Sequence, residues 1–362
     1  AAQPALSGTV PQTLVVLHEV EQGWAVSSIE SDLEMKTQTF EGRLNGIPER
    51  LMAHDLDQDS LVDCILFTPY EPLICLRQTD DQSYELITLS PPGGSWQGGW
   101  ATAGDLDFDG FLDLIMPFKN MARGFKMKSD LASNVSDNAK DREWSLKVIE
   151  QINGPSNTSH LASAVVGENV FQNDPGVVLF DRTGTRLHIA HRDSMGVWRV
   201  RKSQGIPVSD VIGLQWLMGG NKGVPMLLCH GKSEAVVKTF GGKVTQLKQL
   251  DAQNSQAKEA RLHSLIPVDL NDDGFIEVFS LETTEHSIEC FQLESDRSLI
   301  KLNQWSVFEK RSYRNQGAAF PEPKEGIVAD FTGDGLLDLC LIVHDRVILY
   351  PQRAWAGTES DN

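Results

Sequence analysis

The chain has 362 residues and a formal net charge of −18, and 40% of its residues are hydrophobic. A chain this acidic repels phosphate backbones and anionic lipids, which argues against nucleic acid or an anionic membrane as a partner. No apolar run approaches the roughly 18 residues that a membrane-spanning helix needs, so we expect a globular protein without a transmembrane segment.

Short apolar or alternating runs recur along the whole chain and indicate β-strands. Leading strands are expected near residues 14, 64, 114, 177, 226, 278 and 339, at intervals of roughly 50 to 60 residues. Further short strands follow each of them at hairpin distance, and helical periodicity is nearly absent. The sequence therefore predicts an all-β chain of seven repeats.

Four of these leading strands follow an acidic loop, as in "GDLDFDGFLDLIMP" at 104–117. Oxygen-bearing side chains occupy loop positions 1, 3, 5 and 9, and position 6 is Gly in three copies, where a left-handed backbone is expected. Carboxylates this close repel one another unless a hard cation such as Ca²⁺ binds them, together with the carbonyl at position 7. The expected ligands are Asp55, Asp57, Asp59, Leu61, Asp63, Asp105, Asp107, Asp109, Phe111, Asp113, Asp269, Asn271, Asp273, Phe275, Glu277, Asp330, Thr332, Asp334, Leu336 and Asp338.

The loops differ from EF-hands, which need a Glu at position 12 and a helix on each side. In the copy at 105–113, position 12 is Met116 and an apolar strand follows the loop. We therefore expect about four Ca²⁺ sites between strands. Four ions would change the net charge only to about −10, which leaves the protein acidic.

Seven units of about four short strands are typical of a β-propeller, in which each sheet is a blade packed between its neighbours. We expect residues 1–362 to form one propeller of seven four-stranded antiparallel blades, with six blades as the alternative. The last repeat ends after three strands. A strand near the N-terminus, either "TQTFEG" or the segment before Leu14, is expected to complete it.

The repeats resemble FG-GAP and VCBS-type repeats, the calcium-loop repeats of integrin α-subunit propellers and of many secreted bacterial proteins. The resemblance covers nearly the whole chain and rests on the four acidic loops and the strand after each, since literal Phe-Gly and Gly-Ala-Pro signatures are not evident. It implies a propeller with calcium on its blade loops and a binding or adhesive role.

Two repeats are longer than the others and carry basic residues in an otherwise acidic chain. Long propeller loops project from one face, and basic and aromatic side chains there would suit an anionic glycan or an acidic peptide. A solvated excursion is the alternative. The candidate ligand-binding residues are Lys126, Lys128, Arg311, Tyr313 and Arg314, with Trp96 from the Gly-rich segment "PPGGSWQGGW".

The start of the chain, "AAQPALSG", resembles the end left by signal-peptide cleavage, and calcium loops favour a calcium-rich compartment. We expect an exported protein in the periplasm, on the cell surface or in the medium, monomeric or part of a larger multidomain chain. Its five cysteines form no CxxC pair and no evident disulfide framework.

The sequence contains no HExxH, GxSxG or phosphate-loop motif, so no catalytic residue is assigned. This favours a non-catalytic binding or adhesion module that recognises a glycan or an extracellular protein. The alternative is a propeller-fold carbohydrate-active enzyme, such as a polysaccharide lyase, that uses basic residues and a His or Tyr base.

Overall fold

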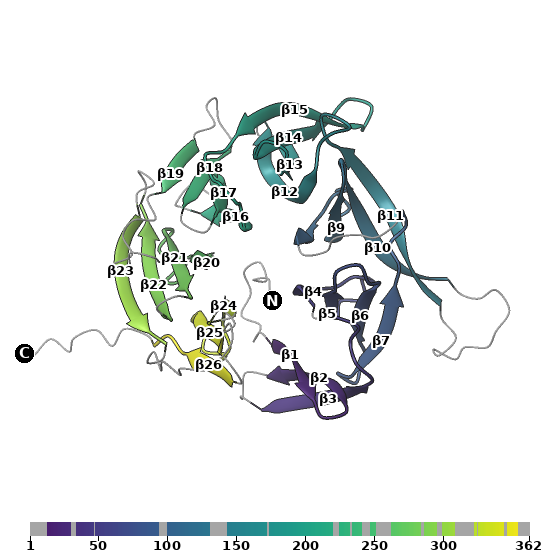
Figure 1. Cartoon of the computed structure of the whole chain (residues 1–362), viewed down its shortest axis with the longest axis vertical. Coiled ribbons are helices and arrows are strands. Elements are labelled where there is room, and N and C mark those ends of the chain that lie inside the picture. The colour runs from purple at the N-terminus through teal and green to yellow at the C-terminus, as the bar shows by residue number, and fades with distance from the viewer. Residues whose placement is uncertain are drawn as a thin grey trace, which may run out of the picture.

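The computed structural model describes residues 13–29, 34–46, 48–93, 100–130, 143–171, 174–219, 224–231, 234–240, 247–250, 262–283, 286–294, 299–307, 322–323, 325–343 and 346–353. These residues form seven antiparallel sheets arranged as a ring (Figure 1). The fold is therefore an all-β, seven-bladed propeller, and the six-bladed alternative is wrong. No helix long and apolar enough to cross a bilayer occurs in the described ranges.

Five of the seven sheets have four strands each in the described residues. They comprise β4 (Arg50–His54), β5 (Asp63–Phe67), β6 (Leu73–Gln78) and β7 (Tyr84–Leu89); β8 (Thr102–Gly104), β9 (Asp113–Phe118), β10 (Met121–Asp130) and β11 (Glu143–Asn153); β12 (Leu161–Phe171), β13 (Asp174–Asp181), β14 (Arg186–Arg192) and β15 (Trp198–Gly205); β16 (Gly213–Gly219), β17 (Val224–His230), β18 (Ala235–Thr239) and β19 (Leu247–Leu250); and β20 (Leu262–Val268), β21 (Ile276–Glu282), β22 (Ser287–Leu293) and β23 (Leu299–Ser306).

The first and last sheets have three described strands each. They consist of β1 (Leu14–Val20), β2 (Gly23–Ile29) and β3 (Met35–Glu41), and of β24 (Glu325–Ala329), β25 (Asp338–Val343) and β26 (Arg346–Tyr350). The expected closing segment "TQTFEG" lies in β3 and its neighbouring residue and pairs with β2, so it does not complete the last sheet. The segment before Leu14, at 1–12, lies outside the described residues.

In each sheet the strands follow chain order from the centre of the ring outward, as from β4 to β7 in Figure 1. The second strand of a sheet is covered by neighbouring blades on both faces, and every residue of β5 and of β21 is buried. This explains why β5 reads as an apolar run in the sequence, although β21 also buries Glu277, Ser280 and Glu282. The outer strand β23 instead alternates between half-buried and exposed residues.

The core consists of seven apolar clusters, one between each pair of neighbouring sheets. The ring closes where Leu14 of β1 packs with Ile327 and Ala329 of β24. All five cysteines are buried and free. Because each blade packs against two neighbours, the ring holds its surface loops on a rigid frame.

The first long repeat owes its length mainly to strands. Lys126 and Lys128, which were expected on a projecting loop, lie on β10, which pairs with β9 and β11. Residues 131–142 lie outside the described part of the chain. The pairing of β10 with β11 passes from Gly124–Glu150 to Phe125–Val148, so a β-bulge leaves Ile149 of β11 unpaired. β10 was not predicted as a strand because basic residues interrupt its apolar ones.

Candidate functional site

The four acidic loops occupy the same place in four different sheets. Each joins the innermost strand to the second strand, namely β4 to β5, β8 to β9, β20 to β21 and β24 to β25. Since the sheets are arranged radially around the centre, the four loops lie on one face of the ring. They cover residues 55–63, 105–113, 269–277 and 330–338.

The acidic side chains shape each loop through hydrogen bonds from the backbone. The first carboxylate accepts from N–H groups near the middle of the loop, the fifth residue accepts from the seventh, and the ninth accepts from the second. In the 105–113 loop, the donors are the N–H groups of Asp109 (3.1 Å) and Gly110 (2.9 Å) to Asp105, of Phe111 (3.0 Å) to Asp109, and of Leu106 (2.8 Å) to Asp113. The other three loops repeat this pattern, with Gly333 replacing the fifth residue as a donor in the last loop.

The sixth residue of each loop has a positive φ. The angles are 91° at Gly110, 85° at Gly274 and 86° at Gly335, but the same position is Ser60 in the first loop, with φ 74°. A side chain raises the energy of this conformation, whereas Gly adopts it without a steric penalty. The conformation predicted for this position is thus present in all four loops, including the one that lacks Gly.

The ninth residue of each loop is buried at the start of the second strand. Asp63, Asp113 and Asp338 are 0% exposed, and Glu277 is 3% exposed. Burial raises the pKa of Asp63 to about 7 and that of Asp113 to about 6, although a backbone N–H donated to each carboxylate acts in the opposite direction. A buried carboxylate of this kind is stabilised by a nearby cation.

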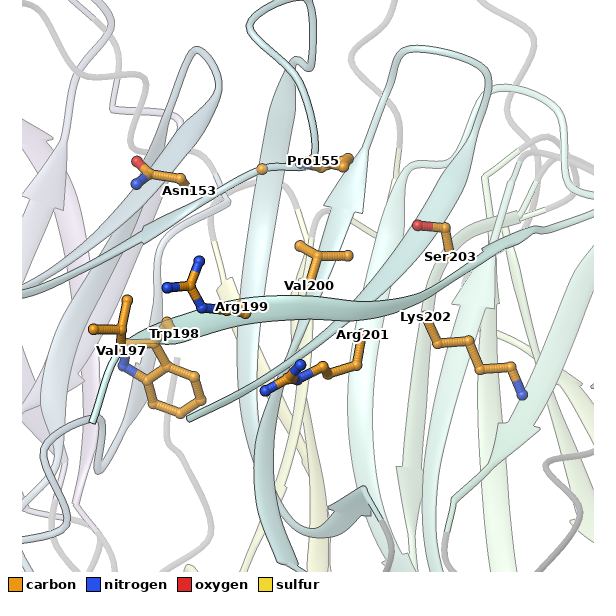
Figure 2. A pocket seen from close by; sticks show the side chains of 10 residues that line it. Asn153, Pro155, Val197, Trp198, Arg199, Val200, Arg201, Lys202 and Ser203 are labelled. Atoms are coloured by element: carbon orange, nitrogen blue, oxygen red, sulfur yellow. The ribbon is translucent and has the colours of Figure 1, made fainter. Parts of the chain in front are cut away.

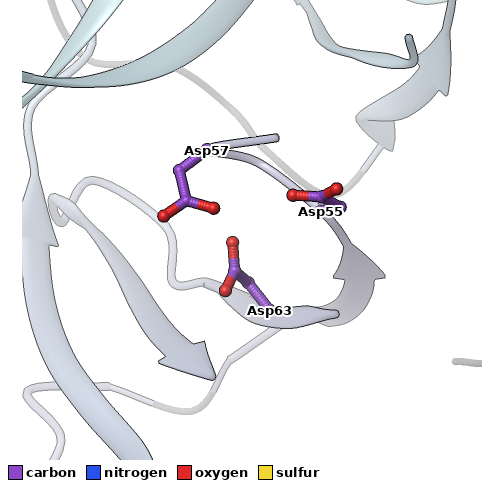
Figure 3. Close-up of side chains that lie close together, drawn as sticks. All are labelled: Asp55, Asp57 and Asp63. Carbon is purple, nitrogen blue, oxygen red and sulfur yellow. The ribbon is translucent and has the colours of Figure 1, made fainter. Parts of the chain in front are cut away.

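Carboxylates converge most closely in the first two loops. Figure 3 shows Asp55, Asp57 and Asp63 facing one another, and one oxygen of each lies within 4.8 Å of the others. Asp105, Asp107 and Asp109 form the same kind of group in the next blade. Such convergence needs positive charge between the side chains.

A basic side chain of the protein lies against some of the acids of each of these two loops. Lys126 Nζ lies 2.5 Å from Asp109 Oδ2, 3.2 Å from Asp107 Oδ2 and 3.5 Å from Asp113 Oδ1. In the 55–63 loop, Arg77 Nε lies 2.5 Å from Asp57 Oδ2, and its Nη2 donates to Asp59.

The donor sets of the loops differ in how well they fit Ca²⁺, which takes six to eight oxygen ligands. Among the described residues, the acids of the 269–277 and 330–338 loops form no ion pair. Buried oxygens without a hydrogen-bond partner occur in both kinds of loop, namely Thr332 Oγ1 in the last loop and Asp107 Oδ1 and Asp113 Oδ1 in the 105–113 loop. The 269–277 and 330–338 loops fit Ca²⁺ because no basic side chain of the described residues lies against their acids. The first two do not fit it as they stand, because Arg77 and Lys126 lie against their carboxylates.

Comparison with known proteins bears on the first two acidic loops. Residues 55–116 match the family model described as "FG-GAP-like repeat". The chain is thus similar to an FG-GAP-like repeat over this segment. The matched segment begins at the first residue of the 55–63 loop and ends three residues after the 105–113 loop, so it holds two of the four acidic loops on which the resemblance rests. No curated protein sequence matches the chain significantly.

Solved structures show the same fold. A crystal structure of a protein from Lactobacillus plantarum is 12% identical with a TM-score of 0.57, and the match covers 95% of this chain and 93% of that one. A periplasmic gluconolactonase from Pseudomonas aeruginosa, PpgL, is also 12% identical with a TM-score of 0.51, covering 94% of this chain and 99% of that one. At this identity the likeness concerns the fold alone.

Two of the six predicted ligand-binding residues belong to the described part of the chain, and both lie on β10. Lys126 is 6% exposed and lies against the acids of the 105–113 FG-GAP-like loop, so the expectation that it lies on an exposed loop is wrong. Lys128 is exposed on β10. Trp96, Arg311, Tyr313 and Arg314 lie outside the described residues.

A cavity of about 550 Å³ lies on the face opposite the acidic loops, where second strands turn into third strands. Its lining comes from three neighbouring sheets and comprises Glu49, Pro69, Tyr70, Trp100, Pro117, Phe118, Lys119, His160, Leu161, Ala162 and Arg182. Sequence reasoning missed it, since these residues are adjacent only after three blades pack together. The pairing of exposed aromatic and basic residues in turns was the available signal.

Stacked rings and cations dominate this cavity. Trp100 stacks on Phe180 with ring centroids 5.9 Å apart, and the Arg182 guanidinium lies 5.4 Å from the Trp100 ring. Lys119 Nζ lies 5.0 Å from the Phe118 ring, and Tyr70 is 77% exposed. Such a surface can stack on the face of a ring and attract an anion.

A hollow of similar size, about 560 Å³, runs along the outer strand β15 (Figure 2). Its basic side chains, Arg199, Arg201 and Lys202, point in different directions, and Asp193 binds Arg199 at 2.6 Å. Because the charges do not converge, this hollow is a weaker candidate for a binding site.

Proposed function

We propose that this protein is an exported, calcium-binding propeller that acts as a non-catalytic binding module for an anionic glycan. An extracellular protein with an acidic surface is the other ligand of this class. The observation that carries the proposal is the cavity formed by Tyr70, Trp100, Lys119 and Arg182. Its volume of about 550 Å³ lies within the range of roughly 300–1,000 Å³ that is usual for ligand sites.

The chemistry of the cavity favours a sugar acid. Trp100 and Tyr70 offer aromatic faces on which a sugar ring can stack, and Lys119 and Arg182 offer positive charge for a carboxylate or sulfate. In a protein of net charge −18, two cations beside aromatic rings give this cavity a locally positive character. Glu49 is the one acid among the lining residues and would disfavour a second anion next to it.

Calcium has a structural role in this proposal. Ions in the 269–277 and 330–338 loops would bind carboxylates together between the first two strands of their sheets. The acidic loops and the cavity are on opposite faces of the ring, so the ions would stabilise the frame without touching the ligand. Ligand recognition should therefore depend on calcium only through folding.

The test is a glycan array with neutral and uronate-containing oligosaccharides, followed by titration of any ligand found. Trp100→Ala and Arg182→Ala should each weaken binding at least about tenfold, as buried aromatic and Arg contacts commonly do. Arg186→Ala is the matched control, because Arg186 is exposed on β14 and does not line the cavity. Equal binding by all three variants would rule out the cavity as the ligand site.

A carbohydrate-active enzyme is the second candidate, and one observation favours it. His160 and Tyr70 line the same cavity as Arg182, so a base and a cation for a uronate carboxylate would be near one another. Incubation with uronate polymers should then give unsaturated products that absorb ultraviolet light. Loss of this absorbance in His160→Ala would identify a lyase, and its absence in the wild type would leave the binding module.

A further inference from the structure

The acidic loops are of two kinds, and one position on the third strand distinguishes them. Cys64 pairs with Leu76, so Arg77 lies across from Asp63. Leu114 likewise pairs with Phe125, so Lys126 lies across from Asp113. The basic residue therefore stands at the same place in both sheets, opposite the last carboxylate of the loop.

The other two loops have an uncharged residue at this position. Glu277 pairs with Gln292 in the β20–β23 sheet. In the last sheet Leu339 pairs with Tyr350, so Pro351 is across from Asp338. Neither residue carries a charge that could neutralise the loop.

We propose that Arg77 and Lys126 are built-in counter-ions that take the place of Ca²⁺ in the 55–63 and 105–113 loops. Metal binding is thereby confined to the 269–277 and 330–338 loops. The acidic repeats thus divide into two ion-paired blades that are independent of calcium and two blades that respond to it.

The Lys126 ammonium contacts the carboxylates that were expected to bind Ca²⁺. Its Nζ contacts the carboxylates of the third, fifth and ninth loop residues, at 3.2, 2.5 and 3.5 Å. The side chain is 7% exposed, so it is packed into the blade rather than extended into solvent. A divalent ion at the same carboxylates would have to displace the ammonium and would then lie close to another positive charge.

Arg77 makes the equivalent contacts with a different shape. Its planar guanidinium bridges Asp57 and Asp59, and its side chain is 17% exposed. Its stem passes Trp144, whose ring centroid lies 5.0 Å from the guanidinium carbon. A planar group held between two carboxylates and an aromatic ring is fixed in position.

The convergence of carboxylates follows the same division. Among the described residues, acidic groups within 4.8 Å of one another occur in the 55–63 and 105–113 loops, which are the loops with an internal cation. The third residue, which belongs to both groups, is Asn271 or Thr332 in the other two loops and carries no charge. The acidic third residue is therefore present in the two loops with an internal cation, and Arg77 and Lys126 each contact it, at Asp57 and Asp107.

The experiment measures calcium bound per chain after dialysis of the whole protein against CaCl₂, by elemental analysis and by calorimetric titration. Wild type should bind no more than two ions. Lys126→Gln and Arg77→Gln each recreate the arrangement around Gln292 and should gain one ion. Lys128→Gln, on the exposed side of the same strand, is the matched control and should gain none.

The reverse substitution tests whether a basic residue at this position prevents calcium binding. Gln292→Lys should introduce a counter-ion into the 269–277 loop and remove one ion from the wild-type number. Because Gln292→Lys adds a cation to an acidic site, this variant should fold without calcium. It therefore tests the counter-ion role even if Lys126→Gln folds only with calcium bound.

Four ions in the wild type would overturn the inference. Unchanged binding in both Lys126→Gln and Arg77→Gln would also overturn it. If the wild type binds no ion, the proposal that the 269–277 and 330–338 loops bind calcium is wrong. A gain of bound calcium in Lys126→Gln or Arg77→Gln would still support the counter-ion role. The two proposals can therefore fail separately.

Discussion

The indole of Trp216 lies directly against Gly167, so a β-carbon on Gly167 would be 2.1 Å from Trp216 Cζ2. Gly167 belongs to β12 and Trp216 to β16, the innermost strands of neighbouring blades. Trp216 also packs on Phe240, with ring centroids 5.2 Å apart. The absence of a side chain at residue 167 thus allows two blades to approach near the centre of the ring.

Gly167→Ala should destabilise the protein by about 1–3 kcal/mol, because the added methyl group overlaps the Trp216 ring and forces the blades apart. Urea unfolding followed by tryptophan fluorescence measures the change. Gly205→Ala is the control, since a β-carbon there meets nothing within 4 Å. Equal stability of the two variants would show that the interface adjusts without strain.

Calcium should stabilise the fold. A site occupied at about 100 times its dissociation constant adds roughly 2.7 kcal/mol to the free energy of unfolding. Chelation with EGTA should therefore lower the melting temperature, and Asp334→Ala should remove part of the difference between melts with and without calcium. Asp80→Ala, at an exposed turn, should keep the full difference. An identical wild-type melt in EGTA would contradict calcium binding.

Local patterns made the ring of blades predictable. The ligand-like residues of an acidic loop all lie within nine positions, and the buried second strand follows at once, as in the run from Asp105 to Phe118. Each such unit can be recognised in isolation, and its repetition indicates a propeller. Seven blades and the positive φ at Gly110 and its equivalents were therefore accessible from the sequence.

Contacts between distant residues were not predictable in the same way. Lys126 reaches the acids only because β9 and β10 pair in one register, and the basic residues of β10 obscure it as a strand. The cavity depends on three blades, so Trp100 and Arg182 come together only through packing between sheets. Strand register and the packing between sheets arise in the folded chain, so they cannot be read from a single sequence.

Lys238 is a buried cation that has no carboxylate partner among the described residues. It is 0% exposed, and its Nζ donates to Gln204 Oε1 at 2.5 Å and lies 5.5 Å from the Phe240 ring. Burial, with a smaller contribution from Lys202, lowers the pKa of Lys238 to about 8. The folded chain therefore disfavours the charged form.

Lys238→Met should increase stability at neutral pH, because it removes a buried charge and keeps the apolar length of the side chain. In the wild type, the unfolded chain holds this proton up to about pH 10.4, whereas the folded chain releases it near 8. Stability should thus rise with pH between these values, and the Met variant should lack that rise. Lys128→Met is the control, and denaturant melts from pH 7 to 10 distinguish the two.

Asp181 joins two segments that line the cavity. Its Oδ1 accepts the backbone N–H groups of His160 (2.9 Å) and Thr183 (2.8 Å). His160 lines the cavity, and Thr183 directly follows Arg182, which also lines it. Asp181 Oδ2 lies 3.3 Å from His188 Nε2. Burial raises the pKa of Asp181, but these backbone hydrogen bonds outweigh it and leave the pKa lowered.

Asp181→Ala should destabilise the protein by about 1–3 kcal/mol, because two N–H groups in a partly buried place would lose their acceptor. It should also weaken ligand binding, since His160 and Arg182 would no longer be held together. Asp181→Asn keeps an acceptor oxygen and should retain most of the stability.

The pH dependence separates charge from hydrogen bonding. A lowered pKa in the folded state means that the charge of Asp181 stabilises the protein above the unfolded value of about 3.9, and that this stability is lost as pH falls through the folded pKa. The Asn variant should lack this acid-side loss, which melts from pH 7 down to 2 can measure. If Asp181→Ala binds the ligand as tightly as wild type, the two segments keep the shape of the cavity without Asp181.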